Sequence, residues 1–448
     1  GMEVRMTETG EKKIREQLRF AGFERFDETL PLNAPVLYGD EAELAGKAIR
    51  DGLGKDNTLI LEKEAARYIG TGYAAALSSN TAAVHLALKL AAEKLYGSSS
   101  GISTPDAGRN GGALTGRRVF CPDFTTSDII DPVLYEGGEP VFIDASSYDW
   151  GMDPEVLELA FAKYPDVKIV IMKHVYGFAG QAGAIRDICD AHGALLIEDI
   201  SDSLGADIAG RKAGSFGHYG VIGFEPGGII AGHGGMLLTN EYYSCKKAKS
   251  WALGAHAQAE WDQREELGYS YAMSEAEAAV IRAQFTRLEA HIGKKKSIFD
   301  KYRNELDEDL VFLNPTAEET SPSFWQPCIT CESSIQFKET RSEREYTYVV
   351  QHGTASPMEI FDALWAFNIE SRPLYKPMHM QPLYGRFDQI TLDGSRHSYE
   401  EFNNDNFWVR SNVSKYNFLN GLCLPASLGM TEGQQEQVIA IVNACFNG

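Results

Sequence analysis

Short apolar runs alternate with amphipathic stretches over residues 73–240. Six runs have the length and apolar character of buried strands, and they cover residues 73–77, 118–122, 140–144, 167–175, 194–200 and 220–225. The segment 183–193 ("GAIRDICDAHG") is typical of a helix that ends at a glycine. Buried strands separated by helices predict an α/β fold with a mainly parallel sheet, covered by helices on both faces.

The segment 273–306 predicts one long amphipathic helix, which begins at a capping box formed by Ser274 and Glu277. The residues that follow mix strand-like stretches with helix-like ones, such as 357–369 ("PMEIFDALWAFNI"). We therefore expect a large α/β domain over residues 1–295 and a smaller C-terminal α+β domain over residues 296–448. Two polar stretches, 97–117 and 385–415, have no clear periodicity, and the sequence does not predict whether they are ordered.

The composition narrows the classes of partner. The chain has 448 residues with 63 acidic and 42 basic side chains, for a formal net charge of −21. Such a surface repels phosphate backbones, which argues against nucleic acid as a partner but leaves room for a small anionic substrate. Seven scattered cysteines fit reduced thiols, and the single C-x-x-C at 328–331 lacks the second ligand pair of a metal site. No apolar run could span a bilayer, so we expect a soluble, cytoplasmic protein without a metal.

Three segments fall where ligands bind in open α/β sheets, beyond the carboxyl ends of strands. Ser78–Thr81 ("SSNT") joins a strand to a helix, where it serves either as a phosphate cradle or as an ordinary helix cap. Glu198-Asp199 ends a buried strand, where a carboxylate needs a cation such as an arginine or a protonated ring nitrogen. The third segment, 210–235, is dense in glycine, which indicates close approach of the backbone to another group.

These stretches, taken in order, resemble the DegT/StrS family of nucleotide-sugar aminotransferases, a branch of the fold-type I enzymes that use pyridoxal 5'-phosphate (PLP). The matching segments are "SSNTAAVHLAL", "PDFTTSDIIDPVLYEGGEPVFID", "LLIEDISDSLGA", "GRKAGSFG", "GHGGMLLTN" and "ESRPLYKPMHMQPLY". The resemblance covers nearly the whole chain. It implies a large domain with a mainly parallel sheet of about seven strands, a smaller C-terminal domain, and a homodimer.

The resemblance also implies roles for particular residues. Asp199 matches the aspartate that pairs with the pyridine nitrogen of PLP, which keeps the ring an electron sink. Asn80 and Thr81 match the phosphate cradle, and Asp202 lies where the family has a residue near the ring hydroxyl. A basic trio matches a segment at the mouth of the site and could meet a nucleotide diphosphate, although it could equally be a surface loop. The trio consists of Arg372, Lys376 and His379.

The sequence departs from the family at the coenzyme. Gly228 stands where the family has the lysine that holds PLP as a Schiff base and moves protons during the reaction. His233 is the nearest residue that could take part in catalysis in its place. Gly223 replaces a phosphate-binding serine, and Thr126 replaces the aromatic residue that stacks on the ring. We therefore expect any PLP or pyridoxamine 5'-phosphate (PMP) to be bound without a covalent link.

Two hypotheses follow. In the first, the protein is an enzyme that uses PLP or PMP on nucleotide-linked keto sugars in the biosynthesis of amino sugars or surface polysaccharides. In the second, it is a non-catalytic homologue that binds a sugar nucleotide or pairs with an active paralogue. Gly228 and Gly223 separate the two, because an active transaminase of this family needs the lysine and the serine at these positions.

Overall fold

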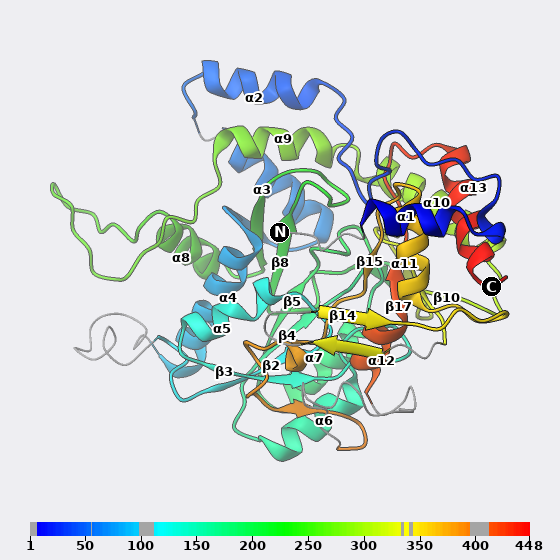
Figure 1. The fold of residues 1–448 in the computed structure, drawn as a ribbon. Coiled ribbons are helices and arrows are strands. Elements are labelled where there is room, and N and C mark those ends of the chain that lie inside the picture. Colours follow the sequence, from blue (N-terminus) through cyan, green and yellow to red (C-terminus); the bar gives the residue numbers. More distant parts are fainter. Residues whose placement is uncertain (1–6, 55, 98–111, 333–335, 340–343, 395–411) are drawn as a thin grey trace.

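The computed structural model describes residues 7–54, 56–97, 112–332, 336–339, 344–394 and 412–448. Most of the two polar stretches, 98–111 and 395–411, therefore lies outside the described residues. The described residues form a large sheet flanked by helices, with a smaller group of helices and short strands beside it (Figure 1).

The large sheet has eight strands in the order β1-β9-β8-β5-β4-β2-β3-β16. The seven that the resemblance implied are β1 (Tyr73–Leu77), β2 (Arg118–Pro122), β3 (Glu139–Ile143), β4 (Ile169–Lys173), β5 (Leu195–Asp199), β8 (Tyr219–Phe224) and β9 (Gly234–Thr239). The strands from β8 to β16 run parallel, and only β9 pairs antiparallel with its neighbours β1 and β8. The mainly parallel sheet is therefore confirmed.

The eighth strand, β16 (Gln389–Ile390), comes from the polar stretch 385–415 and pairs in parallel with β3. A two-residue strand is too short to give a period-two pattern, so the sequence did not predict it. The extra strand carries the C-terminal part of the chain across the edge of the large sheet. In the segment before it, the Met378 backbone N–H donates to the carbonyl of Asp123, the residue after β2, at 2.9 Å.

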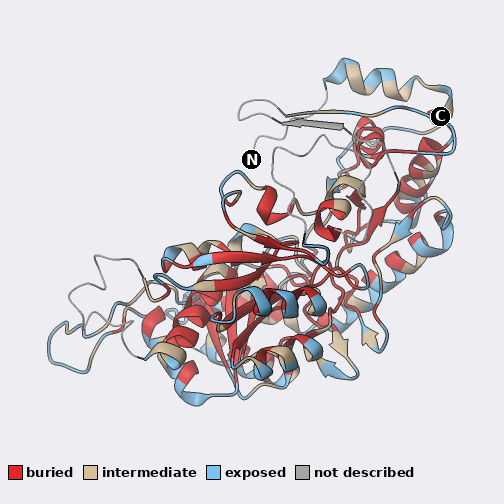
Figure 2. Ribbon diagram, turned by 90° about the horizontal axis from the view of Figure 1, so that it is seen from below, coloured by how far each residue is buried: buried red, intermediate tan, exposed pale blue. Residues whose placement is uncertain are grey.

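Helices cover both faces of the large sheet, and the strands between them are almost entirely buried (Figure 2). The covering helices are α3 (Asp56–Ile69), α4 (Asn80–Tyr96), α5 (Asp131–Tyr135), α6 (Pro154–Lys163), α7 (Ala182–Ala191), α8 (Tyr242–Ala252) and α9 (Glu275–Phe285). Helix α4 packs along the centre of the sheet and is buried from Ala82 to Ala92, because its sequence is apolar on nearly every side.

The smaller core combines the C-terminal part of the chain with its N-terminal segment. Phe20 and Leu30 are buried among residues that follow Ile298. The short strands β10 (Phe312–Leu313), β12 (Cys328–Thr330), β17 (Gly421–Cys423) and β15 (Arg372–Pro373) form its sheet. Its helices are α1 (Glu8–Arg15), α10 (Leu288–Glu305), α11 (Pro357–Ala366), α12 (Val413–Asn420) and α13 (Glu432–Cys445). The predicted boundary at residue 295 falls inside α10, and the division into two domains stays a prediction.

The predicted helix over 273–306 is interrupted. Helix α9 ends at Phe285 and α10 begins at Leu288, so the prediction of one continuous helix was wrong by a two-residue break. The Thr286 hydroxyl donates to the Ala283 carbonyl at 2.7 Å, a local bond that competes with the helical ladder. The predicted start is confirmed, because the Ser274 side chain accepts from the Glu277 backbone at 3.2 Å.

The remaining elements lie at the periphery. They are α2 (Asp40–Arg50), which packs beside α9, and the short strands β6 (Asp207–Ile208), β7 (Arg211–Lys212), β11 (Thr320–Ser321), β13 (Gln336–Glu339) and β14 (Arg344–Thr347). The segment between α8 and α9 extends away from the body of the molecule (Figure 1). Among the helices of the described residues, none is both long and apolar enough to cross a bilayer.

Candidate active site at the carboxyl ends of the central strands

The centre of the site is an ion-pair cluster where strands β4 and β5 end. Lys173 is the last residue of β4 and Asp199 the last of β5, and the two are register partners in adjacent parallel strands. Lys173 is only 2% exposed, and its Nζ lies 3.2 Å from Oδ1 of Asp202, three residues after β5. A third carboxylate, Asp128 in the 3-10 turn Ser127–Ile129 after β2, adds to the field around the ammonium. The buried cation therefore pairs directly with Asp202 and is stabilised electrostatically by Asp199 and Asp128.

The charged groups of this cluster shift one another's pKa values. Burial would lower the pKa of Lys173, but Asp202, Asp199 and Asp128 outweigh it and raise the pKa above that of an ordinary lysine. Burial raises the pKa of Asp202, although the ammonium and a hydrogen bond from Tyr375 act against the shift. Lys173 is thus held as an ammonium ion at neutral pH.

Asn80 forms hydrogen bonds with two of the carboxylates. Its side-chain amide donates to Oδ2 of Asp199 at 2.9 Å and to Oδ2 of Asp128 at 2.8 Å. The second oxygen of Asp199 accepts the Ser201 backbone N–H at 2.7 Å. Asn80 fits because Gly223, on β8, has no side chain: a Cβ there would stand 2.8 Å from the Asn80 Cβ. The amide therefore occupies space beside Asp199 that a larger residue at 223 would need.

Asp202 connects the cluster with the outer part of the site. Its Oδ2 accepts the Tyr375 hydroxyl at 2.8 Å, and the Tyr375 backbone N–H donates to the Tyr176 hydroxyl at 2.8 Å. The two tyrosine rings stack, with centroids 4.5 Å apart. This arrangement holds the segment after β15 against the ends of β4 and β5.

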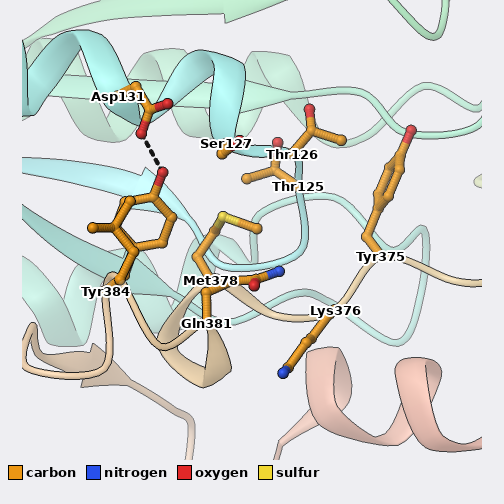
Figure 3. Close-up of a pocket in the computed structure, with 10 residues that line it drawn as sticks. Thr125, Thr126, Ser127, Asp131, Tyr375, Lys376, Met378, Gln381 and Tyr384 are labelled. Carbon is orange, nitrogen blue, oxygen red and sulfur yellow. Dashed lines mark hydrogen bonds between the residues drawn. The ribbon is translucent and has the colours of Figure 1, made fainter. Parts of the chain in front are cut away.

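A cavity of about 380 Å³ opens beside Tyr375 (Figure 3). Its walls mix polar and apolar surface in nearly equal parts, and they come from the segment after β2 and from the C-terminal segment 375–384. The lining residues are Thr125, Thr126, Ser127, Asp131, Tyr375, Lys376, Met378, Gln381, Leu383 and Tyr384. The Tyr384 hydroxyl donates to Asp131 across one side of the cavity. Tyr375 both lines the cavity and donates to Asp202, so the ion-pair cluster lies directly behind this wall of the cavity.

The residues predicted to hold the coenzyme lie in three different places. Asn80, Asp199 and Asp202 meet in the cluster, and Thr126 lines the cavity while its hydroxyl donates to Asp128. Thr81 lies in the first turn of α4 and is partly buried.

The two predicted catalytic positions lie in the segment after β8. The Gly228 N–H donates to the Glu225 carbonyl at 3.0 Å, which closes a tight turn. A Cβ at Gly228 would stand 3.1 Å from the Ile230 carbonyl oxygen and 3.2 Å from that of Glu225, tighter than ordinary contact. His233 is exposed. This segment therefore contributes no amine, and the backbone at 228 is folded closely around a glycine.

The basic trio is divided. Lys376 lines the cavity. Arg372 is 61% exposed and forms an ion pair with Glu370 at 2.8 Å. His379 is buried, and its Nδ1 lies 2.8 Å from Oδ2 of Asp123, a carboxylate that also accepts from Gln389 of β16. Of the three, only Lys376 is placed where it could meet a ligand in the cavity.

The comparisons with known proteins agree with this geometry. The model of the DegT/DnrJ/EryC1/StrS aminotransferase family matches residues 46–443. The chain belongs to this family. EpsN of Bacillus subtilis (strain 168), which carries the name of a pyridoxal phosphate-dependent aminotransferase, is 32% identical over 425 residues that cover 93% of this chain and 95% of EpsN. The GDP-perosamine synthase of Vibrio cholerae is 25% identical over 425 residues, with 93% of this chain and 99% of that protein covered.

Solved structures of the family share the fold. The aminotransferase TlmJ from Streptoalloteichus hindustanus superposes with a TM-score of 0.73 at 20% identity, covering 93% of this chain and 98% of that one. A family aminotransferase from Brucella abortus gives a TM-score of 0.71 at 21% identity, with 92% and 96% covered. The fold-type I architecture predicted from the sequence is therefore confirmed.

The family uses PLP, but the residues of this chain do not fit PLP as a covalently held group. The lysine position is Gly228, in a turn where even a Cβ is crowded. The carboxylate that matches the partner of the ring nitrogen, Asp199, already has Asn80 on one oxygen and the Ser201 N–H on the other. A buried ammonium, that of Lys173, lies beside it on the neighbouring strand. Asp199 thus has two hydrogen-bond donors from the chain, with a buried ammonium on the neighbouring strand.

Sequence reasoning missed Lys173 and Asp128. Lys173 follows four apolar residues of β4, and a lysine at the end of a buried strand is a signal because it needs a carboxylate partner. Asp128 lies in the stretch "TTSDII", which has no period that would indicate its direction. In the part of the chain that the structure describes, no group of three His, Cys, Asp or Glu residues is placed to bind a metal ion.

Proposed function

We propose that this protein acts on a nucleotide-linked keto sugar in the biosynthesis of amino sugars for surface polysaccharides. One observation carries the proposal: a cavity of about 380 Å³ is lined by Tyr375, whose hydroxyl donates to Asp202 of the carboxylate cluster. That volume lies within the range of small-molecule sites. The relatives support the substrate class, since they include perosamine synthases and transaminases named for dTDP- and UDP-linked sugars.

The charges of the site favour one orientation of the ligand. The inner end holds Asp199, Asp202 and Asp128, which repel a diphosphate. Lys376, at the outer wall, offers a cation to the diphosphate oxygens. Hydroxyl and amide side chains between them can form hydrogen bonds with sugar hydroxyls. The sugar ring therefore faces the cluster, with the nucleotide toward solvent.

We also propose how a coenzyme is held and how the chains assemble. Any PLP or PMP that takes part is held without a covalent link, since position 228 has no amine. The protein works in the cytoplasm as a homodimer. The protruding segment between α8 and α9 supports the dimer, because it exposes Trp261 (69%) and Leu267 (50%) to solvent in the single chain.

The experiment is a calorimetric titration with GDP-, UDP- and dTDP-linked hexoses, beside the free nucleotides and the free sugars. Ser127→Trp fills the cavity from its wall and serves as the blocked variant, and Ser297→Trp, on an exposed face of α10, is its matched control. Binding of one nucleotide class by the wild type and the control, with at least a tenfold loss in the blocked variant, supports the proposal. Equal binding by all three proteins contradicts it.

A second candidate function is favoured by Gly228 itself: a non-catalytic homologue that binds the same ligand or partners an active paralogue. Incubation with a nucleotide-linked 4-keto sugar, glutamate and PLP distinguishes the two, with the product followed by mass spectrometry. Conversion of the keto sugar to the amino sugar supports the catalytic proposal. Binding without conversion, at full occupancy of the ligand, favours the second.

A further inference from the structure

We infer that Lys173 is an internal counter-ion that takes the electrostatic place of a ligand's cationic ring at Asp199, and so determines which ligands the site accepts. The inference rests on the arrangement of the chain's own residues and does not depend on the proposed substrate. It makes Lys173 a specificity-determining residue, and it explains how a site with three carboxylates remains buried at the end of the sheet.

The register of the sheet places the cation. In parallel strands, register partners project to the same face, so the side chains of Lys173 and Asp199 leave the sheet side by side. Asp202, on the turn after β5, closes the pair from the other side at 3.2 Å. Asp128 lies in the short 3-10 turn Ser127–Ile129 after β2 and is linked to Asp199 through the Asn80 amide. The ammonium therefore has Asp202 as its direct partner and lies beside Asp199 in the sheet, where Asp199 and Asp128 add to its electrostatic stabilisation.

Burial makes this cation necessary. Lys173, Asp199 and Asp202 are 2%, 0% and 7% exposed, so their charges are largely removed from water. A buried carboxylate without a positive partner is costly, and removing one partner of a buried ion pair strongly destabilises a fold. A fold that carries Lys173 satisfies Asp199 without any ligand. A fold that lacked it would depend on a bound cation.

The same geometry argues against Lys173 as a substitute for the missing lysine at 228. A Schiff base forms when a neutral amine attacks an aldehyde and water leaves, so an ammonium must first lose a proton. Here three carboxylates hold the ammonium, and Lys173 does not line the cavity. The amine is thus neither free of its proton nor open to an incoming aldehyde.

The first test uses PLP as the probe and Asp199→Asn as the variant. If Lys173 is the partner of Asp199, the loss of the charge at 199 changes the affinity for PLP by less than about threefold. If the ring nitrogen of bound PLP pairs with Asp199, the same change weakens binding more than tenfold, and that result overturns the inference. Thermal unfolding of the variant without PLP confirms that it is folded before the titration is interpreted.

The second test uses the pH dependence of stability. Lys173→Met leaves Asp199, Asp202 and Asp128 without their cation, which raises their pKa values in the folded state. Carboxylates with raised pKa values lose stability as pH rises through those values, so the deficit against the wild type is largest at pH 7 and shrinks toward pH 4. A deficit that is equal at both pH values contradicts the counter-ion role and indicates lost packing alone.

Lys295 offers a matched control. It is also 2% exposed, but its Nζ donates to the Asn33 side chain and the Ala426 carbonyl, and within the described part of the chain it pairs with no carboxylate. Burial lowers the pKa of Lys295 to about 7. Lys295→Met therefore gives a deficit that stays constant between pH 6 and pH 4, where that of Lys173→Met falls. If both variants lose stability with the same pH profile, the carboxylates beside Lys173 do not distinguish the two lysines. The inference then fails.

Discussion

Asn80 donates its side-chain amide to Asp199, and its Cβ stands only 2.8 Å from the point where Gly223 would carry a Cβ. The two positions therefore exclude one another: a side chain at 223 requires Asn80 to move, and Asn80 in place requires glycine at 223. Glycine at 223 therefore leaves the Asn80 side chain free to bond Asp199.

Gly223→Ala should destabilise the protein by about 1–3 kcal/mol, the usual range for overpacking a filled site. The reason is the contact between the new methyl group and Asn80. Chemical denaturation measures the loss. In the double variant Asn80→Gly/Gly223→Ala the added methyl group no longer meets Asn80, so the two changes should couple favourably by at least about 1 kcal/mol. Strict additivity of the two effects would show that the residues do not exclude one another.

Gly228→Lys should not restore a Schiff base with PLP. A Cβ at 228 stands 3.1 Å from the Ile230 carbonyl oxygen, so the new side chain strains the turn, and Asp199 is already satisfied within the chain. We expect a lower melting temperature and an absorbance spectrum of free PLP. Gly228→Ala, which adds the Cβ alone, shows how much of the destabilisation is steric. A new visible band in Gly228→Lys that borohydride abolishes would contradict this expectation.

Lys376→Ala should weaken the binding of a nucleotide-linked sugar about tenfold, the usual effect of one charge-assisted hydrogen bond to a phosphate. Lys376 is the predicted cationic residue that lines the cavity, and the free sugar should bind the variant and the wild type equally. Lys296→Ala removes an exposed lysine paired with Asp300 and is the control. Equal loss for both variants would assign the effect to the overall charge of the protein.

Glu136 should stabilise the fold at neutral pH and lose this effect in acid. Burial alone would raise its pKa, but a 2.6 Å hydrogen bond with His85 and the nearby Lys89 ammonium lower the pKa from 4.5 to about 2. A lowered folded-state pKa adds stability that is present above pH 4.5 and is lost as the pH falls toward 2. Glu136→Gln should therefore cost about 3 kcal/mol at most at pH 7.

Urea unfolding of the wild type and Glu136→Gln at pH 7, 4 and 3 checks this window. The difference between the two proteins should be constant from pH 7 to pH 5 and should decrease below. Glu139→Gln is the control, because Glu139 is about half exposed and its ion pair with Arg118 spans 3.7 Å. A difference that does not change with pH would show that the Glu136 carboxylate contributes only through its shape.

The sequence predicted the regular strands of the large sheet. The buried strands follow from their apolar runs, and Asp199 could be placed at the edge of the sheet because it ends such a run. Lys173 could not be assigned, because its direction depends on the pairing of β4 with β5, which no local pattern contains. Two further features, the strand β16 and the break at Thr286, depend on a few residues and on tertiary packing.

The predicted site residues also differ according to whether they lie at strand ends or on irregular segments. Residues at strand ends, such as Asp199 and Asp202, meet because the sheet brings them together. His379 lies on a segment whose position is set by β16, and it is buried against Asp123 rather than at the mouth of the cavity. The surroundings of each predicted side chain therefore depend on contacts that are specific to this chain.

The site carries its own buried cation and has no amine at position 228 to bind PLP covalently. Borohydride reduction of the purified protein with one equivalent of PLP, followed by peptide mass mapping of every lysine, tests both statements together. We expect the peptides that contain Lys173 and Lys376 to remain unmodified, with only substoichiometric labelling of exposed lysines. A stoichiometric phosphopyridoxyl adduct on Lys173 would contradict the account, because that amine would then have replaced the missing lysine at 228.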